Sequence, residues 1–96
     1  MAFSYSDKNF TVVGNLCFVH IFLDGTERMI DIPPAISDRM IYKTMGYIYP
    51  YVPRETSGTI GGIVDIGLAR IVDGAIILFD LGEGYLTFYF PIDSNK

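Results

Sequence analysis

The C-terminal third of the chain constrains the fold most strongly, because it reads as apolar β-strands separated by tight turns. Asp73-Gly74 lies between two apolar runs, and this pair favours a two-residue type I′ hairpin turn, in which both central positions need a positive φ. Residues 81–84, Leu-Gly-Glu-Gly, provide a second and longer turn. We therefore expect three antiparallel strands, near residues 59–72, 75–80 and 85–90.

The N-terminal half predicts further strands. Residues 10–13 form a short apolar run that Gly14-Asn15 breaks or bends. Residues 16–23 follow, with apolar side chains at both odd and even positions. Such a strand is buried on both faces, or buried on one face and used in an interface on the other. Asp24-Gly25 is another hairpin signal, and it predicts a return strand over residues 27–32.

The middle of the chain is harder to interpret. Pro33-Pro34 should end the strand before it, because proline cannot donate a hydrogen bond to the ladder. Residues 37–44 fit either one short helix with Ser37 as its N-cap or an irregular segment. Residues 46–53, Gly-Tyr-Ile-Tyr-Pro-Tyr-Val-Pro, carry two prolines. These prolines restrict the segment to an edge strand or an extended loop.

Together these signals predict the fold class. Ninety-six residues are enough for one domain, and we expect residues 1–96 to form a single β domain. Six to eight short strands with frequent turns indicate an all-β fold, a compact antiparallel barrel or jelly-roll-like sandwich with at most one short helix.

Composition narrows the possible partners. Half of the residues are hydrophobic, more than a small domain readily buries, which favours an oligomer over an apolar monomer. The net charge is −4 and the sequence has no cluster of lysine and arginine, which argues against a nucleic-acid partner. The longest uncharged run, residues 9–23, is too short for a membrane helix, and the N-terminus lacks the pattern of a signal peptide.

The sequence offers little for catalysis, metal binding or a cofactor. Cys17 and His20 are the only cysteine and histidine. Residues three apart on a strand point to opposite faces, so these two cannot chelate one ion together. We expect His20 to be a hydrogen-bonded or interface residue. Residues 58–62, Gly-Thr-Ile-Gly-Gly, match neither a dinucleotide-binding nor a P-loop pattern. No pair of carboxylates stands out, so we expect a protein that is not an enzyme and needs no cofactor.

Two features suggest ligand binding. A row of tyrosines alternates along residues 47–51 and would share one face of an extended strand; tyrosine suits sugar stacking, and also interface or core packing. A polar cluster could supply paired hydrogen bonds to a sugar, or it could be a solvated surface or an intersubunit salt bridge. The candidate saccharide-binding residues are Tyr47, Tyr49, Tyr51, Asp38, Arg39 and Arg54.

The order of these segments resembles the C-terminal head domains of bacteriophage tail-fibre and baseplate receptor-binding proteins. The similarity covers most of the chain. It includes Gly14-Asn15 between two apolar strands and the run Ile-Asp-Ile-Pro-Pro at residues 30–34. It also includes the closing segments 62–78 and 84–90 with their spaced glycines and aromatic residues.

The resemblance implies a homotrimeric β head at the tip of a phage tail. Such a head would act at the host cell surface without catalysis, by binding a bacterial saccharide in clefts between protomers. The alternative is a structural β domain that docks on another protein through its apolar face.

Overall fold

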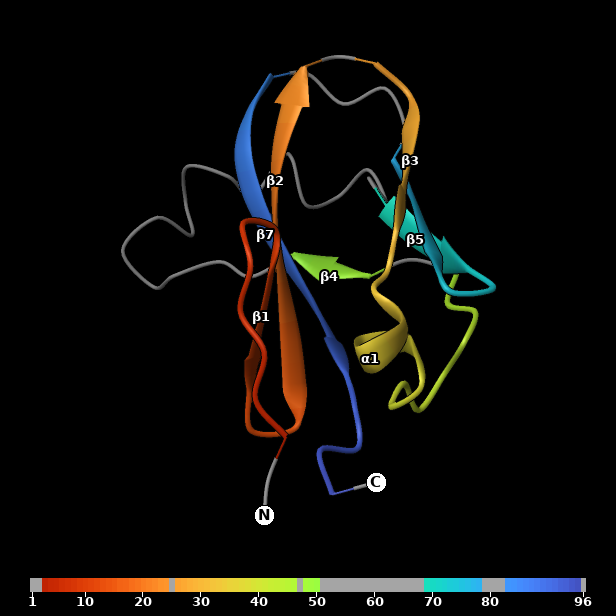
Figure 1. Cartoon of the computed structure of the whole chain (residues 1–96). Helices are drawn as coiled ribbons and strands as arrows, with labels where there is room; N and C mark the ends of the chain where they lie inside the picture. The colour runs from red at the N-terminus through yellow and green to blue at the C-terminus, as the bar shows by residue number, and fades with distance from the viewer. Residues whose placement is uncertain (1–2, 25, 47, 51–68, 79–82, 96) are drawn as a thin grey trace.

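We analysed a computed structural model of the chain (Figure 1), which describes residues 3–24, 26–46, 48–50, 69–78 and 83–95. Within these residues the structure has seven strands and one short helix. In chain order they are β1 (Phe10–Val13), β2 (Leu16–Asp24), β3 (Arg28–Asp31), α1 (Pro34–Ser37), β4 (Tyr49–Pro50), β5 (Ala69–Val72), β6 (Ala75–Leu78) and β7 (Glu83–Pro91).

The strands form two antiparallel sheets. One sheet has the order β1-β2-β7-β4, and the other has the order β3-β6-β5. In Figure 1 the first sheet lies on the left and the second on the right, with α1 below β3. This arrangement confirms the predicted all-β class, but the two sheets do not close into a barrel.

The β5–β6 connection is the hairpin that the sequence predicts. Val72 pairs with Ala75, which leaves Asp73 and Gly74 as the two loop residues. Their φ angles are 48° and 81°, the positive values at both positions that a type I′ turn requires. Gly14-Asn15 likewise forms a tight two-residue turn, because Val13 pairs with Leu16.

Two expected connections are wrong. Asp24-Gly25 does not join a hairpin, because β2 pairs with β1 and β7 while β3 pairs with β6 in the other sheet. The turn near residues 81–84 does not join a hairpin either, since β6 and β7 belong to different sheets. The physical reason is length: β2 and β7 each have nine residues and pair along their whole extent, which a four-residue partner cannot offer.

Of the two interpretations of residues 37–44, the irregular one is confirmed from residue 38 onward, and the one helix of the described residues lies before it. This helix begins at Pro34 and ends at Ser37, with Asp38 as C-cap, so Ser37 is not its N-cap. Proline is tolerated in the first turn because the amide there has no intrahelical partner. The edge position expected for residues 46–53 is confirmed at β4, which flanks β7 at the border of its sheet; most of the predicted strand 59–72 lies outside the described residues.

The core lies between the two sheets. Strand alternation places every second residue of β2 inward, and β7 does the same with Leu86, Phe88 and Phe90. The other sheet contributes the inward residues of β5 and β6 to the same core. The largest fully buried side chains are Phe88, Phe90, Ile21, Ile36, Ile48, Ile71, Ile76, Leu78, Ile92, Val19 and Cys17. The other residues of β2 and β7 face away from this core.

Candidate functional site

The structure describes only part of the predicted tyrosine row. Tyr49 lies in β4, where its Cα is the register partner of Tyr89 in β7. Tyr47 and Tyr51 lie outside the described residues. Tyr42, further back along the chain, is exposed.

The predicted polar cluster is described for Asp38 and Arg39, and Arg54 lies outside the described residues. Asp38 is exposed at the end of α1. Arg39 lies with its guanidinium 3.8 Å from the ring centroid of Phe3, and its Nη1 donates to the carbonyl of Ala35 at 2.9 Å. The backbone amide of Asp93 donates to the carbonyl of Arg39. These contacts give Arg39 a structural role that joins α1 to both ends of the chain.

A second set of aromatic residues lies on the outward face of β2 and β7. Phe22 and Tyr85 are register partners, with ring centroids 4.9 Å apart in an edge-to-face arrangement. Phe18 and Tyr89 are partners in the same way, with centroids 6.1 Å apart. We call these four residues the aromatic ladder. Tyr85 is 82% exposed and Phe22 48%, so this end of the ladder can be reached from solvent.

His20 lies at the middle of the aromatic ladder. Its register partner is Thr87, whose hydroxyl oxygen lies 3.1 Å from Nδ1, and the hydroxyl oxygen of Thr11 lies 3.3 Å from Nε2. The prediction that His20 is a hydrogen-bonded histidine is thus confirmed. Its exposed ring continues the surface between the two aromatic pairs.

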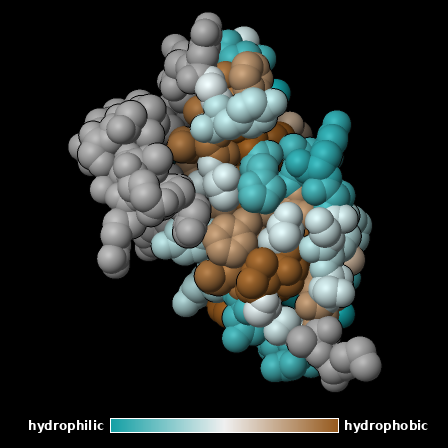
Figure 2. All heavy atoms as spheres, turned by 90° about the vertical axis from the view of Figure 1, so that its left-hand side faces the viewer, coloured by the Kyte–Doolittle hydropathy of each residue, from teal (hydrophilic) through white to brown (hydrophobic). Residues whose placement is uncertain are grey.

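In Figure 2 the side of the molecule that carries the four-stranded sheet shows hydrophobic residues gathered in its middle, with hydrophilic residues at the top, at the upper right and at the bottom. This distribution agrees with the exposed apolar residues of β2 and β7. Sugar-binding and protein-binding surfaces both combine aromatic faces with a polar rim.

A hollow of about 500 Å³ opens beside the exposed end of the ladder. We call it the His20 hollow; its lining includes Lys8, Asn9, His20, Phe22, Arg28 and Tyr85. It lies beyond the last β1–β2 pair, Phe10 with Val19, where β2 continues toward Asp24. There the Arg28 guanidinium donates to the carbonyl of Phe22. Among the described residues, two cationic side chains and no carboxylate line the hollow, so it favours hydroxyl or anionic groups.

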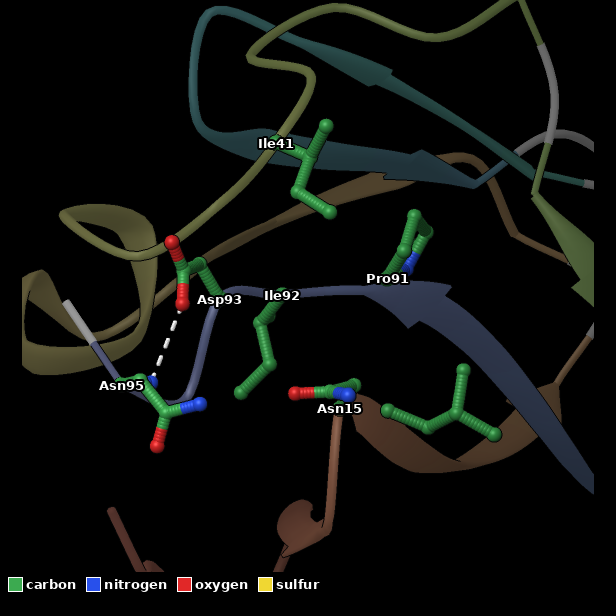
Figure 3. A pocket seen from close by; sticks show the side chains of 7 residues that line it. Asn15, Ile41, Pro91, Ile92, Asp93 and Asn95 are labelled. Atoms are coloured by element: carbon green, nitrogen blue, oxygen red, sulfur yellow. Dashed lines mark hydrogen bonds between the residues drawn. The ribbon is translucent and has the colours of Figure 1, made fainter. Parts of the chain in front are cut away.

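A second hollow of about 420 Å³ lies at the other end of β2 and β7. We call it the Asn15 hollow, and its lining consists of Asn15, Leu16, Ile41, Pro91, Ile92, Asp93 and Asn95. In Figure 3 the polar side chains lie around Ile92, with Ile41 and Pro91 further along. The Ser94 hydroxyl donates to Asn15 Oδ1 at 3.0 Å, and the Asn95 amide donates to Asp93 Oδ1 at 3.0 Å.

The cysteine is not a nucleophile in this structure. Cys17 is fully buried, and burial raises the pKa of its thiol to about 12, so the reactive thiolate is absent at neutral pH. Cys17 and His20 face opposite sides of β2, as the sequence predicts. Within the described ranges, no group of three or more His, Cys, Asp or Glu side chains is placed to hold a metal ion.

Sequence reasoning missed the aromatic ladder, although its signals were present. The apolar outward positions of residues 16–23 and the outward placement of Tyr85 and Tyr89 were both readable. What the sequence did not show was that these two strands pair.

The part of the chain that the structure describes contains no helix long and apolar enough to cross a membrane.

No protein-family model, no curated protein and no solved structure matches this chain.

Proposed function

We propose that this protein is the receptor-binding head of a bacteriophage tail fibre or baseplate, a non-enzymatic module that binds a saccharide of the bacterial cell surface. The observation that carries the proposal is the Phe22–Tyr85 pair, an exposed aromatic platform beside a hollow lined by hydrogen-bond donors. A pyranose ring has an apolar face and a rim of hydroxyls. The aromatic platform can stack against the apolar face, and the hollow can bind the hydroxyls.

The donors around this platform match such a ligand. Lys8 and Arg28 supply charged donors, and His20 supplies a ring that already exchanges hydrogen bonds with hydroxyls. Hydrogen bonds from charged donors are stronger than those between neutral groups. In this proposal Phe22 and Tyr85 stack on the sugar, while Arg28 and Lys8 bind its hydroxyl or acidic groups.

The proposed head is a homotrimer at the tail tip. Support comes from apolar side chains that remain exposed away from the ladder, among them Val13, Met29 and Val72. Exposed apolar surface of this kind is commonly covered in an assembly. Three weak sites in one head would gain affinity through effective concentration.

The direct test is a binding screen against cell-wall polysaccharides purified from a panel of bacteria, with the protein labelled and the polysaccharides immobilised. We expect binding to at least one polysaccharide, and we expect Tyr85→Ala to weaken it by about tenfold, which corresponds to ~1.4 kcal/mol. Tyr42→Ala is the matched control, since Tyr42 is an exposed tyrosine away from the platform. Absence of binding across the panel, or equal loss in both variants, would reject the proposal.

The second candidate is a β domain that docks on another protein. The specific observation in its favour is that the outward face of β2 continues past the ladder to Leu16, which is also exposed and apolar. Under this reading the protein binds no glycan, and Leu16→Asp releases a protein partner that wild-type protein retains.

A further inference from the structure

We infer that the two hollows and the aromatic ladder form one elongated track, which holds a linear saccharide chain of several sugars rather than a single terminal sugar. This inference depends on the proposed function and adds the shape and size class of the ligand. It rests on the positions of the two hollows relative to one pair of strands.

The two hollows lie at opposite ends of one strand pair, β2 and β7. Leu16 pairs with Pro91, and both line the Asn15 hollow. Phe22 pairs with Tyr85, and both line the His20 hollow. All four occupy outward positions, because their separations along each strand are even numbers of residues.

The distance between the hollows sets the length of the ligand. Six residue steps along β2, from position 16 to position 22, span about 20 Å at roughly 3.3 Å per residue. One pyranose ring is much shorter than this distance, so only a chain of several rings could reach both hollows. Between them lie the half-buried Phe18–Tyr89 pair and the His20–Thr87 pair. The exposed ring of His20 is the polar group that a bound chain would pass on the way.

The Asn15 hollow has side chains that can bind sugar hydroxyls. The buried Ser94 hydroxyl donates to Oδ1 of Asn15. This hydrogen bond fixes the orientation of the Asn15 side-chain amide. Asp93 uses Oδ1 to accept from the Asn95 backbone. The amide nitrogen of Asn15 and the second oxygen of Asp93 make no hydrogen bond among the described residues. The Asn15, Asp93 and Asn95 side chains thus line one hollow with donor and acceptor atoms that can bind sugar hydroxyls.

The two ends of the track differ in charge, so the bound chain has a direction. Lys8 and Arg28 make the His20 hollow cationic, whereas Asp93 is the one charged group among the described residues that line the Asn15 hollow. Acidic substituents on a sugar would be attracted to the first hollow and repelled from the second. A chain with an acidic group near one end would therefore bind in one orientation.

The test uses the polysaccharide that binds best in the screen, cut by partial acid hydrolysis into fragments of two and of six sugars. Affinities are measured by calorimetry for wild type, Tyr85→Ala at one end of the track and Asn95→Ala at the other. The Asn95 side chain makes no hydrogen bond among the described residues, so its removal should leave folding intact; thermal unfolding checks this.

We expect the six-sugar fragment to bind at least tenfold more tightly than the two-sugar fragment, and both variants to weaken it severalfold. We expect only Tyr85→Ala to weaken the two-sugar fragment. Equal affinity for the two lengths, or a six-sugar fragment unaffected by Asn95→Ala, would overturn the elongated track and leave saccharide binding standing. If no polysaccharide binds in the screen, both proposals fail.

Discussion

Phe22 and Tyr85 meet edge to face across β2 and β7, with ring centroids 4.9 Å apart and planes inclined by 61°. They are register partners in the central pair of the four-stranded sheet. Both rings point away from the core and are substantially exposed. The contact is therefore a cross-strand pair at the surface, and it contributes to both stability and the proposed binding platform.

The first prediction concerns the coupling of these two rings. In a double-mutant cycle with Phe22→Ala and Tyr85→Ala, we expect a coupling energy of about 0.5–1 kcal/mol in the free energy of unfolding, because aromatic cross-strand pairs contribute that much. Urea denaturation of the four proteins measures it. Additive effects within about 0.3 kcal/mol would mean that the two rings do not interact in solution.

The second prediction concerns the charge of the His20 hollow. Arg28→Glu places a negative charge among its lining residues, and we expect it to lower affinity for an acidic polysaccharide severalfold, with a loss that shrinks as salt is added. Lys43→Glu is the matched control, because Lys43 bonds to the carbonyl of Ser37 away from the hollow. Binding curves at low and high salt distinguish the two variants; an equal loss in both would show only a long-range effect of net charge.

The third prediction concerns the β5–β6 turn. Gly74 has a φ of 81°, a region that costs a residue with a side chain about 1–2 kcal/mol. We expect Gly74→Ala to lower the melting temperature by about 4–16 °C for a domain of this size. Gly46→Ala is the control, since a Cβ there meets open space and its φ lies outside the left-handed region. A Gly74 variant as stable as the Gly46 variant would contradict the turn.

The same elements show which features of the fold a local sequence pattern can predict. The Asp73-Gly74 turn was predictable because a type I′ turn depends on two adjacent residues. The hairpin predicted at Asp24-Gly25 is wrong because β2 pairs with β7, which is longer than β3 and lies some sixty residues further along the chain. No local pattern encodes that preference.

The position of the helix and the aromatic ladder were likewise not predictable from local patterns. Pro34 was read as the end of a strand, yet it also occupies the first turn of α1. The tyrosine row can be recognised in the sequence because its members are close together, whereas the aromatic ladder is assembled from two separate strands. Strand pairing, which is a long-range property, decided both the sheet order and the location of the exposed aromatic surface.

The fourth prediction concerns pH. The Asp7 carboxylate accepts from the backbone amides of Phe10 and Asn9 and from the Tyr5 hydroxyl. These hydrogen bonds, the one from Phe10 foremost, hold the pKa of Asp7 below its ordinary value of 3.8. A lowered pKa stabilises the fold above the ordinary value, and this contribution is lost as the pH falls below about 4.

We therefore expect wild type to lose more stability between pH 7 and pH 2.5 than Asp7→Asn does, measured by urea denaturation at both pH values. Asp31→Asn serves as the control, because the exposed Asp31 side chain makes no hydrogen bond among the described residues. If Asp7→Asn and wild type lose the same stability on acidification, the turn at Asp7 does not contribute to the acid sensitivity.

The most direct test of the central claim is to map the bound saccharide on the protein by NMR. A ¹⁵N- and ¹³C-labelled sample is titrated with the best-binding polysaccharide fragment, and chemical-shift changes are followed for backbone amides and aromatic side chains. The account predicts that the largest changes fall on Phe22, Tyr85, His20 and Arg28. Changes concentrated elsewhere, for example around Tyr42 or on the outer face of β3, or no changes at saturating ligand, would contradict it.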